Sequence, residues 1–167
     1  PNRNSFCVIN LDEISKKKEY EIINICRSFY NDTFLVDQNA CSSPHLIYWI
    51  GKKNKKIINI FWKSLEKVIK EKNYRNFHSG SYYKYNKLCD EIINLENFDN
   101  FDQFESFYCI NLKRNNFNIN ELISKLGYFY QIHVKNITEV FKNVDSFTQT
   151  MTYYGFKKDM INKNYTK

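Results

Sequence analysis

The stretch PHLIYWIGKKNKKIINIFWKSLEKVIKEK, residues 44–72, decides the expected fold. Ser43 stands before Pro44, a pair typical of a helix start, because serine can cap free N–H groups and proline fits the first turn. Apolar residues then recur at a helical spacing, opposite a face of lysines. The sequence therefore predicts one long amphipathic helix over 44–72, with Trp49 and Trp62 as core anchors.

The same spacing predicts helices on both sides of this segment. Residues 1–10 lack periodicity and are expected as an extended lead-in, and 161–167 as a frayed tail. The other expected helices are 11–30, 81–95, 101–111, 119–144 and 146–160. The chain has only four Gly and two Pro, too few for turn-rich β structure. We predict an all-α fold, an irregular bundle of about five helices whose longest members lie near 44–72 and 119–144.

The length and charge of the chain limit the class of protein to which it can belong. A chain of 167 residues fits a single domain spanning 1–167. The net charge of +7 suggests nucleic acid or an anionic surface as a partner, but the excess of Asn, Lys, Ile and Tyr also fits the codons of an AT-rich genome. No apolar run is long enough to span a bilayer, and the start at Pro1 without a leader suggests a piece of a longer chain.

The five cysteines are widely spaced, without the CxxC pairs or Cys/His clusters of zinc sites, so we expect no metal. They fit either buried free thiols in a cytosolic protein or bridges that tie helix ends in a secreted one. We favour bridges, with one thiol left over. The candidates are Cys7, Cys26, Cys41, Cys89 and Cys109.

Candidate binding residues combine basic and aromatic side chains, which can contact phosphates, sulfated sugars or protein surfaces. They lie at the start of the Lys-rich helix and in YRNFHSGSYYKYNK, residues 74–87, and are Lys52, Lys53, Lys55, Lys56, Tyr74, Arg75, Tyr82 and Tyr83. The acidic cluster is expected as solvated surface and comprises Asp90, Glu91, Glu96, Asp99, Asp102 and Glu105. No catalytic motif or phosphate-cradling glycine loop is present, so we expect neither enzyme activity nor a cofactor.

Three short motifs resemble a known family. INIC at 23–26, Cys41 followed by HLIYWI at 45–50, and KYNKLCDEIINLENF at 84–98 are similar to the Plasmodium interspersed repeat (PIR) superfamily, including its vivax-type members. The resemblance implies a variant antigen with a helical ectodomain, secreted or displayed on the infected cell or parasite surface. Its partner would be a host cell-surface protein or glycan, with no small-molecule substrate and no enzyme activity.

Composition and resemblance together favour a non-catalytic extracellular recognition module that binds host receptors or evades immunity. In this reading Cys26 would pair with Cys41 and Cys89 with Cys109, leaving Cys7 unpaired or bonded outside the segment. One alternative is an erythrocyte invasion ligand. A second, from another class, is an intracellular helical nucleic-acid-binding domain that uses the lysines of 52–72 and keeps its cysteines reduced.

Overall fold

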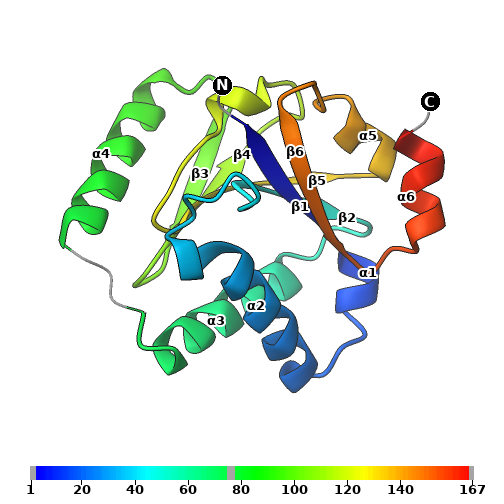
Figure 1. Cartoon of the computed structure of the whole chain (residues 1–167), viewed down its shortest axis with the longest axis horizontal. Coiled ribbons are helices and arrows are strands. Elements are labelled where there is room, and N and C mark those ends of the chain that lie inside the picture. The colour runs from blue at the N-terminus through cyan, green and yellow to red at the C-terminus, as the bar shows by residue number, and fades with distance from the viewer. Residues whose placement is uncertain (1–2, 75–77, 166–167) are drawn as a thin grey trace.

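The fold is α/β, and the all-α prediction is wrong. The computed structural model describes residues 3–74 and 78–165, which form a six-stranded mixed sheet with helices on both faces (Figure 1). The sheet order is β3-β4-β5-β2-β1-β6. The strands are β1 (Asn4–Asn10), β2 (Leu46–Ile50), β3 (Phe98–Gln103), β4 (Tyr108–Leu112), β5 (Tyr128–Val134) and β6 (Thr148–Tyr154).

All strands of the sheet except β3 run in the same direction. Every neighbouring pair is parallel except β3 with β4, which form an antiparallel hairpin. The carboxyl ends of β1, β2, β4, β5 and β6 therefore meet at a single edge. In open α/β sheets, ligands bind outside such an edge, where neighbouring strands send their connections to opposite faces.

Two apolar clusters hold the helices against the sheet. On one face, α2 (Glu19–Thr33) and α3 (Lys55–Glu71) pack on the inward residues of β1 and β2. On the other face, α4 (His78–Asn94) and α5 (Ile137–Phe141) contribute to the second cluster. The remaining elements are short: α1 (Leu11–Ile14), η1 (Phe34–Val36), η2 (Ile119–Glu121) and α6 (Lys158–Tyr165). None of the helices within the described residues has the length and apolarity needed to cross a bilayer.

The expected helix over 44–72 is two elements. Leu46–Ile50 is strand β2, and α3 begins only at Lys55. All five residues of LIYWI are buried, because β2 lies inside a sheet covered on both faces. Strands in such a position are continuous apolar runs, which periodicity alone does not distinguish from a buried helical turn. Gly51, with φ of +107°, then turns the chain between the two elements.

The other expected helices fail for a similar reason. Residues 119–144 contain η2, β5 and α5, and 101–111 contain parts of β3 and β4. Residues 146–160 contain β6 and the start of α6, while the lead-in 1–10 contains β1, an inner strand paired with both β2 and β6. The helical spacing of apolar residues predicted α2 and α4 more accurately than the other helices, because each of these two has one buried side.

The disulfide-linked architecture is also wrong, because all five cysteines are free thiols. Cys7, Cys26 and Cys109 are separately buried in the core cluster under α2 and α3, where each acts as a small apolar side chain. The Cys26 thiol donates to the Phe61 carbonyl at 3.4 Å. Cys41 and Cys89, the expected partners of Cys26 and Cys109, are exposed and free.

Thiol labelling tests this arrangement. Burial raises the pKa of the Cys7 thiol to about 12 and holds that of Cys109 well above its usual value, so little reactive thiolate forms at either. We expect an alkylating reagent to modify Cys41 and Cys89 in the native protein and all five cysteines after denaturation. Intact mass spectrometry reads both, and a mass increase on reduction alone would contradict the free-thiol structure.

Candidate functional site

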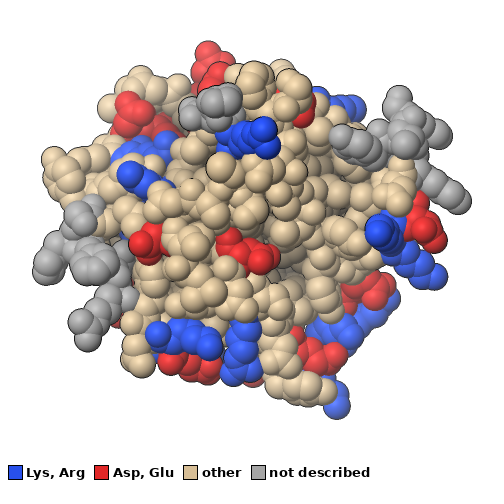
Figure 2. Space-filling view, in the orientation of Figure 1, with Lys and Arg blue, Asp and Glu red and all other residues tan. Residues whose placement is uncertain are grey.

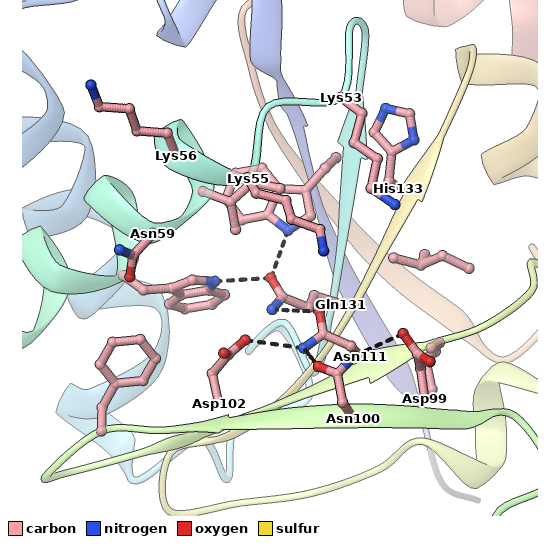
Figure 3. A pocket seen from close by; sticks show the side chains of 16 residues that line it. Lys53, Lys55, Lys56, Asn59, Asp99, Asn100, Asp102, Asn111, Gln131 and His133 are labelled. Carbon is pink, nitrogen blue, oxygen red and sulfur yellow. Dashed lines mark hydrogen bonds between the residues drawn. The ribbon is translucent and has the colours of Figure 1, made fainter.

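A cavity of about 540 Å³ opens on the α3 face of the sheet (Figure 3). Its walls are the turn after β2 and the first half of α3, and its floor is formed by residues of β3, β4 and β5. This volume lies within the range of about 300–1,000 Å³ that is usual for small-molecule pockets. The residues that line the cavity include ten with polar or charged side chains: Lys53, Lys55, Lys56, Asn59, Asp99, Asn100, Asp102, Asn111, Gln131 and His133.

The floor contains a row of three amide side chains. Asn100 on β3 pairs with Asn111 on β4, and Asn111 pairs with Gln131 on β5. Register partners in a sheet project to the same face, so the three amides lie side by side toward α3 (Figure 3). Asp102 follows two residues after Asn100 and joins the same face of β3. Strand pairing thus assembles side chains from three distant parts of the sequence.

The hydrogen bonds in this row run in one direction. The Gln131 amide donates to Asn111 Oδ1 at 3.0 Å. The Asn111 amide donates in turn to Asn100 Oδ1 at 2.7 Å and to Asp102 Oδ2 at 3.0 Å. The Asn100 amide then donates to Asp99 Oδ2 at 2.8 Å. Each amide has its oxygen toward the core and its nitrogen toward the carboxylates.

Two buried indoles set this direction. Trp49 Nε1 and Trp62 Nε1 donate to the same Gln131 oxygen at 2.8 Å and 2.9 Å. An indole can only donate, so the Gln131 oxygen must face the tryptophans and its nitrogen must face Asn111. Gln131 is 3% exposed and each tryptophan 1%, so water cannot replace either bond. The row is therefore fixed at its inner end and open to the cavity at its outer end.

The turn after β2 carries Lys53 toward the cavity. Gly51 approaches Asp12 so closely that an added Cβ would lie 2.5 Å from its carboxylate, so this turn needs glycine. Asp12 also accepts the Lys52 backbone N–H at 3.1 Å, which ties the turn to α1. Asn54 then caps α3 by accepting the Ile57 N–H at 3.2 Å.

Three lysines stand at the start of α3, where positive charge is unfavourable. The first turn of α3 holds Lys55 and Lys56 and no acidic residue, although the positive end of the helix dipole favours acids there. Among the described residues, no ion pair includes Lys53, Lys55 or Lys56. Figure 3 shows Lys55 reaching over the amide row, Lys53 beside His133, and Lys56 directed away from the row. Lys53 and Lys55 are thus the two lysines directed toward the cavity floor and His133.

His133 completes the wall at the end of β5. Its Nε2 lies 2.7 Å from the Gly51 carbonyl oxygen, which can only accept, so Nε2 carries the proton of this bond. Within the described residues, Nδ1 makes no hydrogen bond. His133 follows Gln131 by two residues on the same face of β5 and is half-buried. The ring therefore lines the cavity beside Lys53.

The structure separates the binding residues expected from the sequence. Lys53, Lys55 and Lys56 line the cavity, while Lys52 lies in the preceding turn. The Tyr74 hydroxyl donates to Asp37 at 2.6 Å, and its ring packs against Phe34 in the core.

Tyr82 and Tyr83 lie on α4 and do not line the cavity. Tyr82 is 70% exposed on α4, and the Tyr83 ring lies under the Lys125 ammonium group at 5.2 Å. Arg75 lies outside the described residues. The expected binding residues therefore do not form one surface.

Ion pairs interrupt the Lys-rich face of 52–72. Lys67 pairs with Glu19 at 2.6 Å and Lys70 with Glu105 at 2.7 Å. Figure 2 likewise shows basic and acidic side chains side by side along the lower edge, over α2 and α3. These exposed pairs contribute little to stability, but they neutralise part of the stripe that the nucleic-acid alternative would use.

The cavity floor lies outside the binding residues predicted from the sequence. It contains Asn100, Asn111, Gln131 and His133, none of which the sequence prediction includes, and Asp99 and Asp102, which the sequence predicts as solvated surface. The available signal was the two-residue period in YCINL and YFYQIHV, where a polar residue takes an inward position. Reading these segments as helices concealed that signal. Glu91 of the same acidic cluster is buried, where it accepts the hydroxyls of Tyr128 and Tyr130.

Comparisons with known proteins identify no family for this chain: no family model matches its sequence, and a search of curated proteins found no match.

Replacing Gln131 tests the inner end of the row. In Gln131→Leu, both indole N–H groups would lose their acceptor inside the core, at a cost of about 1–3 kcal/mol each. We therefore expect the free energy of unfolding, measured by urea denaturation, to fall by about 2–4 kcal/mol. The control Asn100→Leu changes an exposed member of the row and should cost under about 1 kcal/mol. Equal losses in the two variants would contradict the anchoring role of Gln131.

Proposed function

We propose that this protein reversibly binds a small polar molecule in the cavity beside α3. The observation that carries this proposal is the amide row, which runs from the buried indoles to the cavity mouth with its polar groups fixed in one orientation. Specific ligand sites combine a concave shape with a few precisely oriented polar groups. The cavity supplies the shape, and Gln131, Asn111 and Asn100 supply the groups.

The position of the cavity in the sheet supports the same proposal. β2 continues into α3 on one face, and β5 continues into α5, which belongs to the cluster on the other face. The crevice between β2 and β5 is therefore a point where neighbouring connections diverge at the carboxyl edge. His133 and the turn at Gly51 flank this crevice, where α/β proteins commonly bind ligands.

The extracellular recognition role stays a prediction, as do the PIR resemblance, the absence of enzyme activity and the surface location. The cavity bears on one part of that prediction, the glycan partner, because its amides and carboxylates can bond hydroxyl groups. The invasion-ligand alternative also stays a prediction. The nucleic-acid alternative has less support, since ion pairs occupy Lys67 and Lys70.

A thermal-shift screen with a blocked variant tests the proposal. Asn59 lines the cavity on the exposed surface of α3, so Asn59→Trp would fill the space without disturbing the core. A ligand at a hundred times its Kd adds about 2.7 kcal/mol, which corresponds to a Tm increase of roughly 5–10 °C for a chain of this size. We expect compounds from a panel of small polar metabolites to raise the Tm of the wild type and not that of Asn59→Trp.

Asn86→Trp is the matched control, since it adds the same side chain to an exposed position of α4 outside the cavity. It should respond to each compound as the wild type does. The proposal would be overturned if no compound stabilised the wild type, or if Asn59→Trp responded equally to every compound that did.

A further inference from the structure

Basic and acidic side chains lie on opposite sides of the cavity. Lys53 and Lys55 come from the turn after β2 and the start of α3, while Asp99 and Asp102 come from the hairpin strand β3 on the other side (Figure 3). No ion pair joins the two sets within the described residues, so the cavity separates them by more than the 4.0 Å limit of an ion pair. A ligand that satisfies both sides must carry an anionic end and an end rich in hydrogen-bond donors.

The basic side favours a doubly charged anion. Lys53 and Lys55 supply two ammonium groups that pair with no carboxylate in the described part of the chain, and both lie near the first turn of α3, whose backbone N–H groups carry partial positive charge. Placing lysines at that end of a helix is unfavourable without a compensating anion. A phosphate monoester carries a charge of about −1.5 to −2 at neutral pH and fits this requirement better than a single carboxylate.

The other side favours hydroxyl groups. One oxygen of Asp102 accepts from Asn111 and one of Asp99 accepts from Asn100, which leaves the second oxygen of each carboxylate available. Gln131 uses only one of its two amide hydrogens in the row, and Asn59 lines the same cavity with a further amide. The cavity therefore offers both acceptors and donors, and a hydroxyl is the group that can use both.

We infer that the ligand is a phosphorylated sugar, bound with its phosphate at Lys53 and Lys55 and its hydroxyls against Asp99, Asp102 and the amide row. This inference rests on the proposed function and narrows it to one class of compound. The cavity volume of about 540 Å³ accommodates a hexose phosphate. A zwitterionic amino acid is the competing class, but its single carboxylate brings less negative charge to the two lysines than a phosphate does, and its ammonium group can only donate.

Isothermal titration with separate probes tests the ligand class. The probes are glucose 6-phosphate, glucose, inorganic phosphate and free glutamine. We expect glucose 6-phosphate to bind at least about tenfold more tightly than glucose or phosphate, because only this probe engages both sides of the cavity. Equal affinity for phosphate and glucose 6-phosphate would overturn the inference, and so would tighter binding of glutamine.

Variants that remove a charge test which end of the ligand binds at the lysines and which at the aspartates. The double variant Lys53→Gln, Lys55→Gln should lower glucose 6-phosphate affinity by about 10–100-fold and leave glucose affinity unchanged. Asp102→Asn keeps an oxygen for Asn111 and removes the charge, so it should weaken glucose and glucose 6-phosphate together and spare phosphate. Lys63→Gln and Asp90→Asn are the matched controls, exposed and outside the cavity, and should change each affinity less than about twofold.

The two proposals fail in different ways. If none of these probes binds but another compound in the thermal-shift panel stabilises the wild type and not Asn59→Trp, the sugar phosphate is the wrong class and the binding function stands. If no compound stabilises the wild type, both proposals fail. If glucose 6-phosphate binds equally well to the wild type and to the double lysine variant, the assignment of its phosphate is overturned.

Discussion

Two indole N–H groups share one buried acceptor at the junction of the sheet and α3. Trp49 reaches Gln131 from β2 and Trp62 reaches it from α3, so a single amide oxygen joins two strands and a helix. The rings also contact each other edge to face, with centroids 6.1 Å apart. A buried donor without an acceptor is costly. The two indole N–H groups therefore fix the register of β2 against β5 and the position of α3 on the sheet.

The same bonds connect the core to the surface of the cavity. Gln131 cannot rotate its amide without breaking both indole bonds, and Asn111 must then present its nitrogen to Asn100 and Asp102. The orientation of the amide groups in the cavity floor is therefore fixed by hydrogen bonds in the core, before any ligand is present. Preorganised polar groups lose little freedom on binding, which is why such a floor suits specific recognition of a small molecule.

The sequence predicts the parts of this fold that periodicity can reveal. The amphipathic pattern of α3 is visible in residues 55–71, and the run KKNKK marks the turn and helix start that line the cavity. The strand LIYWI is concealed because it is buried on both faces and so resembles a helical core segment. YFYQIHV does carry a two-residue period, in its polar residues Gln131 and His133. The amide row depends on pairing between strands distant in sequence, and register of that kind leaves no local signal.

Nitrogen-15 NMR of the two indole N–H groups tests the central claim most directly. If Trp49 and Trp62 share Gln131 as an acceptor, both indole protons should exchange slowly with solvent, and Gln131→Leu should shift both resonances while the remainder of the spectrum stays folded. Fast exchange of either indole proton in the folded wild type, or a shift of only one of them, would contradict the shared acceptor and the sheet register that depends on it.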